Sequence, residues 1–128
     1  MIVLDTHTWV WWAADRAKLS KAALAAIESD SRRSLCDVSL REVAHLVQNG
    51  KLVVDRDLRD WLEQAVSAAG VTVVPIRPDI ATRSVQLGRR FQGDPYDQLI
   101  AATAIVESAT LVTKDAKLRA YPGLTTVW

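Results

Sequence analysis

Short apolar runs alternate with longer amphipathic segments along this chain of 128 residues. Four runs are uniformly apolar or β-branched, which is typical of strands buried on both faces: residues 2–4, 35–38, 71–74 and 110–113. Residues 124–127 are a candidate fifth strand. Because helical patterns separate the runs, the sequence predicts an α/β fold with a parallel sheet covered on both faces.

Seven helices are predicted between and after these runs: residues 8–14, 21–29, 40–48, 57–69, 78–87, 96–107 and 116–120. Ser20 is a favourable N-cap for the second of them. Ser39 and Glu42 have the spacing of a capping box at the start of the third. Pro95 stands where the first position of the sixth is expected. These end signals agree with the helical periodicity.

The composition is that of one globular domain, residues 1–128. Apolar residues make up 49% of the chain and charged residues 24%, as in ordinary soluble proteins, and this length suffices for a sizeable core. No apolar run approaches the ~18–20 residues of a membrane helix, so no membrane partner is expected. The formal net charge is +1, so any positive surface for RNA must be local.

The cysteine content and the N-terminal residues favour a cytoplasmic location. Cys36 is the single cysteine and cannot form an intrachain disulfide, which is typical of reducing compartments. The N-terminal residues lack the basic leader and the long apolar core of a signal peptide.

Four acidic residues fall at the ends of apolar runs or near the starts of helices: Asp5, Glu42, Asp97 and Asp115. All strands of a parallel sheet end at one edge, where α/β proteins bind their ligands. The four carboxylates can therefore converge in one crevice. Carboxylates that lie together repel one another, and a divalent cation that prefers oxygen ligands would stabilise the cluster. The pattern predicts a metal-dependent enzyme.

Each of these residues also has a purely structural interpretation, because carboxylates are preferred at helix starts. Asp5 and Asp115 can cap the helices that follow them, and Glu42 can belong to the Ser39 capping box. For Asp5 the position after a buried strand favours a functional role. For Glu42 both interpretations stay open at this point.

A second acidic pair opens the helix over residues 96–107. Asp94 is the predicted N-cap, whereas Asp97 lies within the first turn, near the positive end of the helix dipole. Asp97 is therefore the better candidate for a metal ligand. Thr113, two residues before Asp115, can offer a hydroxyl to a metal, a water or a neighbouring carboxylate.

Several basic and aromatic residues accompany the acidic ones. His7 is close to Asp5 in sequence and can contact a substrate, and Arg89 and Arg90 can meet a phosphate backbone or form a solvated helix end. The five tryptophans are expected in the core or in a dimer interface, because Trp is enriched in both. The chain has no phosphate-binding glycine loop and no Ser or Cys nucleophile motif.

Four segments together resemble the PIN domain, and within it the VapC-type toxins of bacterial toxin–antitoxin pairs. They are Leu4-Asp5-Thr6-His7, Ser39-Leu40-Arg41-Glu42-Val43-Ala44, Gly93-Asp94-Pro95-Tyr96-Asp97-Gln98-Leu99-Ile100-Ala101-Ala102 and Leu111-Val112-Thr113-Lys114-Asp115. The likeness covers nearly the whole chain. Such toxins often carry Arg after the residue matched by Asp97, and Gln98 stands there in this chain.

The resemblance implies a three-layer α/β/α sandwich around a parallel sheet. It also implies an endoribonuclease that depends on Mg²⁺ or Mn²⁺, uses a metal-activated water and is inhibited by a cognate antitoxin. When the functional residues of the family are matched to this sequence, the implied catalytic residues are Asp5, Glu42, Asp97 and Asp115. The implied supporting residues are Thr6, Ser39, Asp94 and Thr113. Asp5 and Asp97 would be the principal metal ligands. Glu42 and Asp115 would hold metal-bound waters or a second ion, and Thr113 would orient Asp115. A homodimer that binds the antitoxin is expected from the many tryptophans.

Two other functions compete with this hypothesis. A receiver-like signalling domain also has a parallel α/β fold with an acidic Mg²⁺ pocket, but it needs paired acidic residues after the first strand, where only Asp5 stands. A catalytically inactive PIN-like binding module is the second alternative, and the complete set of carboxylates argues against it.

Overall fold

The structure is a computed structural model that describes residues 1–128. Five strands form one parallel sheet in the order β3-β2-β1-β4-β5. The strands are β1 (Ile2–Leu4), β2 (Arg33–Cys36), β3 (Val71–Val74), β4 (Thr110–Val112) and β5 (Thr126–Val127). The predicted parallel α/β architecture is confirmed.

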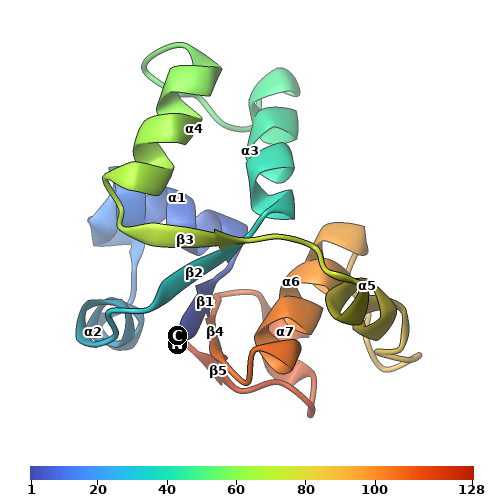
Figure 1. Cartoon of the computed structure of the whole chain (residues 1–128). Coiled ribbons are helices and arrows are strands. Elements are labelled where there is room, and N and C mark those ends of the chain that lie inside the picture. The colour runs from blue at the N-terminus through green and yellow to red at the C-terminus, as the bar shows by residue number, and fades with distance from the viewer.

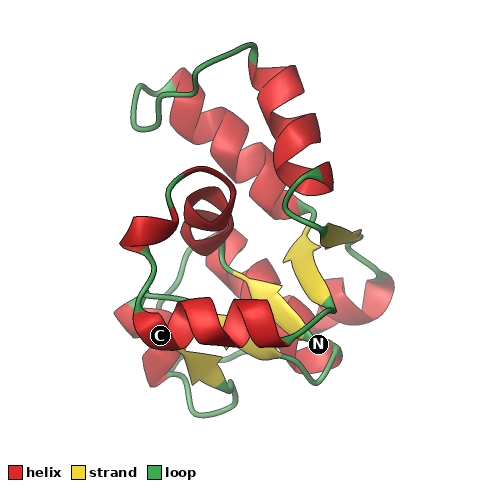
Figure 2. Ribbon diagram, turned by 90° about the vertical axis from the view of Figure 1, so that its left-hand side faces the viewer, coloured by secondary structure: helices red, strands yellow, loops and turns green.

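Seven α-helices and one short 3-10 helix connect the strands: α1 (Thr6–Ala14), η1 (Arg16–Lys18), α2 (Lys21–Ser29), α3 (Val38–Gln48), α4 (Leu58–Ser67), α5 (Pro78–Val85), α6 (Pro95–Val106) and α7 (Ala116–Ala120). Figure 1 shows α1 and α2 on one side of the sheet and α5, α6 and α7 on the other. The helices α3 and α4 rise together at the top of Figures 1 and 2. None of these helices is long and apolar enough to cross a membrane.

Successive side chains of the central strand point to opposite layers, because strand side chains alternate. Leu4 packs with Trp9 of α1 and Trp61 of α4 on one face, whereas Val3 packs with Ile100 of α6 on the other. Leu4, Val3, Trp9 and Ile100 are completely buried. Both faces of β1 are therefore covered, which explains why its sequence is apolar without alternation.

Three of the five tryptophans, Trp9, Trp12 and Trp61, belong to the core. Trp9 and Trp12 donate their indole N–H groups, each at 3.0 Å, to backbone carbonyls in or just after α4. Burial therefore leaves neither group unpaired. Trp11 and Trp128 are half-buried. The expectation that tryptophans lie in the core is confirmed for these three.

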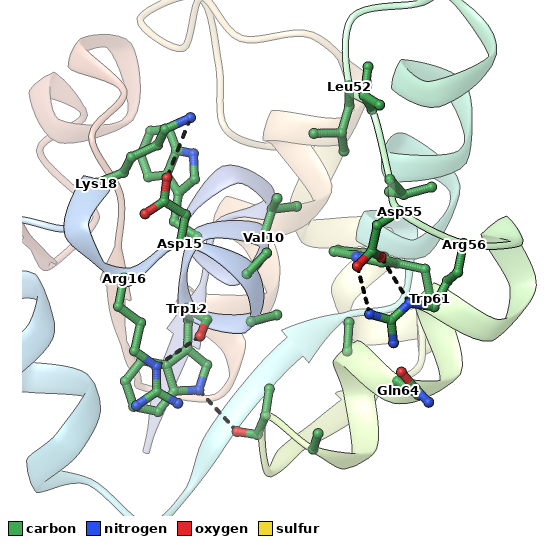
Figure 3. Close-up of a pocket in the computed structure, with 18 residues that line it drawn as sticks. Val10, Trp12, Asp15, Arg16, Lys18, Leu52, Asp55, Arg56, Trp61 and Gln64 are labelled. Atoms are coloured by element: carbon green, nitrogen blue, oxygen red, sulfur yellow. Dashed lines mark hydrogen bonds and ion pairs between the residues drawn. The ribbon is translucent and has the colours of Figure 1, made fainter.

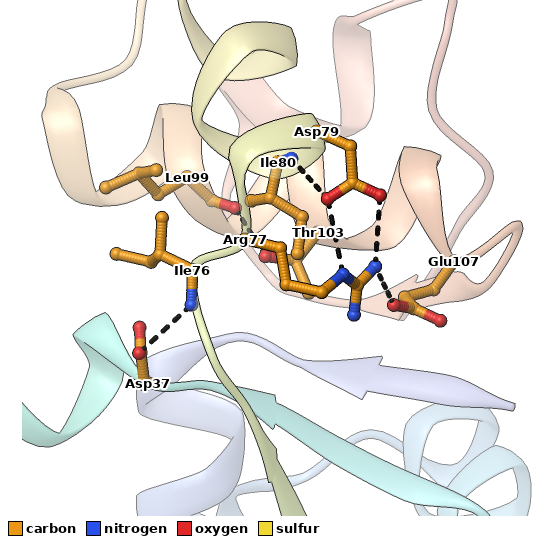
Figure 4. Close-up of polar contacts among 8 residues, drawn as sticks. All are labelled: Asp37, Ile76, Arg77, Asp79, Ile80, Leu99, Thr103 and Glu107. Carbon is orange, nitrogen blue, oxygen red and sulfur yellow. Dashed lines mark hydrogen bonds and ion pairs between the residues drawn. The ribbon is translucent and has the colours of Figure 1, made fainter.

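Polar contacts join α5 to α6, and the chain after β3 to the chain after β2 (Figure 4). Arg77 donates from Nε to Asp79 Oδ1 at 3.2 Å and from Nη2 to Glu107 Oε1 at 2.5 Å, which joins the start of α5 to the end of α6. Asp37 Oδ2 accepts a hydrogen bond from the backbone N–H of Ile76 at 3.1 Å. This bond ties the chain that leaves β3 to the chain that leaves β2.

Several predicted boundaries were wrong by one or two residues, and two of them have a clear structural reason. The second strand covers Arg33–Cys36 rather than residues 35–38, because Arg33 pairs in register with neighbouring strands and Val38 already begins α3. The fifth helix ends at Val85 rather than at Leu87. Gly88 adopts a left-handed φ of +84°, which turns the chain away after the helix.

Candidate active site

Asp5 directly follows β1, and both of its carboxylate oxygens accept hydrogen bonds. Only 9% of the residue is exposed. Oδ1 accepts from the backbone N–H of Thr6 at 2.8 Å, and Oδ2 accepts from the hydroxyl of Thr113 at 2.7 Å. Asp5 is the N-cap of α1, as its structural interpretation predicted. The contact with Thr113 adds a fixed orientation at the sheet edge, which a cap alone does not need.

Thr113 connects the ends of two adjacent strands. Its completely buried hydroxyl donates to Asp5 and accepts from the backbone N–H of Asp115 at 3.0 Å. The sequence-based expectation that Thr113 orients the side chain of Asp115 was therefore wrong in its detail. The hydroxyl orients the carboxylate of Asp5 and holds only the backbone of Asp115.

Asp115 caps α7 as expected from its position. Its Oδ1 accepts hydrogen bonds from the backbone N–H groups of Lys117 at 2.8 Å and Leu118 at 3.3 Å. Neither bond uses Oδ2. The cap therefore leaves one oxygen of Asp115 for another partner.

The capping box predicted at Ser39 is wrong. Asp37 is the N-cap of α3, and Ser39 lies inside its first turn. The completely buried hydroxyl of Ser39 shares a 2.9 Å hydrogen bond with the hydroxyl of Thr6. Glu42 lies one turn further along α3 and makes no capping bond. Glu42 therefore has no capping role. The hydroxyl groups of Thr6 and Ser39 lie next to it as a polar pair.

Asp94 and Asp97 form the capping box that opens α6. The backbone N–H of Asp97 donates to Asp94 Oδ1 at 2.9 Å, and that of Asp94 donates to Asp97 Oδ2 at 3.3 Å. Gly93 permits this arrangement, because a Cβ there would lie 2.5 Å from Asp97 Cβ and 2.6 Å from the ring of Phe91. The N-cap role predicted for Asp94 is confirmed. The steric need for Gly93 was not predicted, since it depends on how closely the backbone approaches Asp97.

Burial and mutual repulsion raise the pKa values of three carboxyl groups. Burial is the main cause that raises the pKa of Glu42 to about 7 and that of Asp97 to about 6, and the charge of Asp5 adds to both. Burial also raises the pKa of Asp5, against the opposing hydrogen bonds from Thr113 and Thr6. The charge of Asp115 raises the pKa of both Asp5 and Asp97. All four predicted acidic residues therefore lie within electrostatic reach of one another.

The donor set of this crevice fits a hard divalent cation. No Lys or Arg neutralises it, because none of the six ion pairs of the chain includes Asp5, Glu42, Asp97 or Asp115. No three acidic, His or Cys side chains lie close enough together to hold a metal directly. Mg²⁺ commonly binds through one or two carboxylates and keeps several waters. Asp5 and Asp97 could contact such an ion directly, while Glu42 and Asp115 could hold its waters.

Of the predicted substrate-binding residues, His7 lies near the acidic residues, whereas Arg89 and Arg90 lie beyond α5. The exposed His7 is close enough for its charge to lower the pKa of Asp5. Arg89 and Arg90 are exposed in a turn beyond α5 rather than at a helix end, and their proposed contact with RNA stays a prediction.

One contact beside the crevice was missed from the sequence. Arg41 donates a hydrogen bond from Nη1 to the hydroxyl of Tyr96. The bond bridges α3 and α6 next to Glu42 and Asp97. No local signal indicates it, because Arg41 and Tyr96 are 55 residues apart in the chain.

An apolar cavity of about 720 Å³ lies elsewhere, between α1, η1, residues 52–56 and α4 (Figure 3). Twelve of its 18 lining residues are hydrophobic, Val10, Trp12 and Trp61 among them. None of the four carboxylates lines it. The cavity and the acidic crevice are therefore separate features of the surface.

The model of the PIN domain family matches residues 2–124. The chain belongs to the PIN domain family. A relative from Mycobacterium tuberculosis (strain ATCC 25618 / H37Rv), the ribonuclease VapC22, is 39% identical over 129 residues, which cover 99% of this PIN domain chain and 98% of the relative. The family expected from the four sequence segments is thereby confirmed.

Solved structures of other proteins share the fold. A toxin–antitoxin complex from Klebsiella pneumoniae contains a chain with a TM-score of 0.71 and 20% identity, covering 100% of this chain and 97% of that one. VapBC2 from Rickettsia felis, bound to a DNA fragment from its promoter, contains one with a TM-score of 0.74 and 20% identity, covering 99% and 98%. At this identity the likeness concerns the fold alone.

Proposed function

We propose that this PIN domain protein is a metal-dependent endoribonuclease and the toxin of a toxin–antitoxin pair. The observation that carries the proposal is the convergence of Asp5, Glu42, Asp97 and Asp115 at the carboxyl edge of the sheet, where none of them forms an ion pair with a Lys or Arg. The 39% identity to a VapC ribonuclease supports RNA as the substrate.

The chain itself supplies orientation and charge at this site. Thr113 holds Asp5 through a 2.7 Å hydrogen bond, and the capping box holds Asp97 at the start of α6. Glu42 has a pKa of about 7, so it can accept or release a proton near neutral pH. Mg²⁺ or Mn²⁺, when bound, supplies polarisation of the scissile phosphate and lowers the pKa of a bound water. Asp5 and Asp97 would hold such an ion, and the ion would draw the substrate phosphate to this edge of the sheet.

The proposed protein partner is a cognate antitoxin, because relatives of the same fold were solved as toxin–antitoxin complexes. The apolar cavity between α1 and α4 has the chemistry of a protein-binding surface. Val53, one of its lining residues, is 89% exposed. A homodimer and a cytoplasmic location stay predictions from the sequence.

The strand order argues against a receiver-like domain. Receiver domains have the order 2-1-3-4-5, whereas this sheet has β3-β2-β1-β4-β5. A catalytically inactive binding module is distinguished by activity. With Mg²⁺ or Mn²⁺, the wild-type protein should cut single-stranded RNA, while EDTA or the Asp5→Asn substitution should stop it. Wild-type protein that binds the antitoxin but cuts no RNA with either metal would support the inactive module instead.

A further inference from the structure

A row of three aromatic rings lies beside the acidic crevice. The rings of His7 and Trp11 are 5.8 Å apart between centroids and tilted by 53°, and those of Trp11 and Trp128 are 5.8 Å apart and tilted by 55°. His7 is exposed, and Trp11 and Trp128 are half-buried. We call these three residues, with Lys114, the aromatic flank.

The sheet topology places the aromatic flank next to the catalytic carboxylates. His7 and Trp11 lie on α1, which follows β1, and they are one helical turn apart. Lys114 follows β4, between Thr113 and Asp115. Trp128 follows β5, directly after Val127, whose carbonyl accepts a hydrogen bond from Thr113 N at 3.1 Å. Three distant segments of the chain therefore meet at one end of the crevice.

The aromatic flank brings positive charge to an acidic region. The ammonium of Lys114 lies 5.9 Å from the centroid of the Trp11 ring, within the range of a cation–π contact. Lys114 belongs to none of the six ion pairs of the chain. Its charge therefore remains available to a phosphate. An RNA chain that reaches the carboxylates needs such a charge nearby, because the carboxylates themselves repel its phosphates.

We propose that the aromatic flank binds the segment of single-stranded RNA adjacent to the scissile phosphate. Unpaired bases stack on Trp128 and His7, and a backbone phosphate pairs with Lys114. Stacking on aromatic rings next to a basic group is the common mode of binding to single strands, and it tolerates different bases. Paired bases cannot use these rings, because their faces are already stacked in a duplex. The inference rests on the proposed ribonuclease function.

Trp128 and Lys114 are the residues to change, because Trp11 also lines the apolar cavity and Trp128 does not. The substitutions are Trp128→Leu, with Trp128→Phe to retain a ring, and Lys114→Gln, with Lys114→Arg to retain the charge. Lys51→Gln is the matched control, because Lys51 is exposed beyond the far end of α3. Cleavage of a single-stranded RNA of about 12 nucleotides is measured with Mg²⁺.

Trp128→Leu and Lys114→Gln should each raise KM about 5- to 100-fold, with little change in kcat. Trp128→Phe and Lys114→Arg should recover most of this loss, and Lys51→Gln should behave as wild type. The same changes in an Asp5→Asn background should weaken binding of the labelled RNA, measured by fluorescence anisotropy, and the duplex of the same sequence should bind equally weakly to all variants.

The proposal would be overturned by a Trp128→Leu variant that binds and cleaves RNA as wild type does, or that loses only its association with the antitoxin. If wild-type protein cleaves no RNA, the proposed function fails, and the anisotropy comparison still decides whether this surface binds single strands.

Discussion

The hydroxyl of Thr113 donates a 2.7 Å hydrogen bond to Asp5 Oδ2 and so joins the carboxyl ends of β4 and β1. The hydroxyl oxygen of Thr113 also accepts a hydrogen bond from the backbone N–H of Asp115 at 3.0 Å. One buried hydroxyl therefore sets the orientation of a candidate metal ligand and the path of the chain toward another carboxylate.

Thr113→Val should reduce RNA cleavage about 10- to 100-fold, because partners that orient metal ligands typically matter to this extent. The substitution keeps the shape but leaves the backbone N–H of Asp115 without its acceptor, so unfolding should become easier by about 1–3 kcal/mol. Thr113→Ser keeps the hydroxyl and serves as the control. Cleavage assays and denaturant unfolding measure both effects. Equal cleavage by the Val and Ser variants would contradict the orienting role.

Asp5→Asn and Asp97→Asn should abolish cleavage while the protein stays folded. An amide oxygen still accepts the capping hydrogen bonds, whereas it is a far poorer partner for Mg²⁺ than a carboxylate. Asp94→Asn should be milder, because Asp94 is exposed and serves as the N-cap of α6. Single-turnover cleavage at limiting metal tests the three variants. The metal-ligand hypothesis is falsified if Asp5→Asn and Asp97→Asn cut RNA at the wild-type rate.

Gly93→Ala should lower cleavage without changing the acidic residues. The added Cβ would lie 2.5 Å from the Cβ of Asp97, so the start of α6 must move and displace this carboxylate. A strained contact of this kind typically costs about 1–3 kcal/mol of stability. Gly123→Ala is a control for the glycine replacement itself, because the three atoms nearest to its added Cβ all belong to the side chain of Tyr121 and not to an acidic residue. Comparable cleavage by both variants would show that Asp97 needs no fixed position.

Mg²⁺ or Mn²⁺ should raise the melting temperature of the wild-type protein, and EDTA should reverse the rise. A ligand that binds only the folded state stabilises it by about 2.7 kcal/mol at a hundredfold excess over its dissociation constant. Asp5→Asn should melt at the same temperature with and without metal. Differential scanning calorimetry measures the shift, and identical wild-type curves in both buffers would count against a shared metal site.

The metal-free protein should lose stability as the pH rises from about 4 to 7. The pKa of Glu42 rises from 4.5 to about 7 and that of Asp97 from 3.8 to about 6. In this window the folded protein binds more protons than the unfolded chain, so its free energy of unfolding falls with pH. The loss should be on the order of 2 kcal/mol. Glu42→Gln removes one of the two groups, so its unfolding free energy measured in EDTA should depend less on pH. An unchanged slope in that variant would refute this assignment.

Much of the fold was predictable from local sequence. The strand over residues 71–74 and the helix over residues 116–120 have the predicted boundaries. Ser20 and Asp94 cap the helices they were expected to cap. Cap preferences and hydrophobic periodicity depend on nearest neighbours in the chain, which the sequence displays directly. The parallel sheet also followed, because strands separated by helices have few other ways to bury both of their faces.

The role of Glu42 could not be separated from a capping box by sequence alone, since the spacing from Ser39 satisfies both. Only the structure decided it, by starting α3 two residues earlier than predicted and turning Ser39 toward Thr6. The hydrogen-bond partners of Thr113 and Arg41, which are Asp5 and Tyr96, likewise lie far away in the chain, at 108 and 55 residues respectively.

The sequence by itself therefore determined which residues end strands and begin helices. The tertiary structure decided which of them lie together, because parallel strands bring distant segments to the same edge, where burial raises the pKa of Asp5, Glu42 and Asp97.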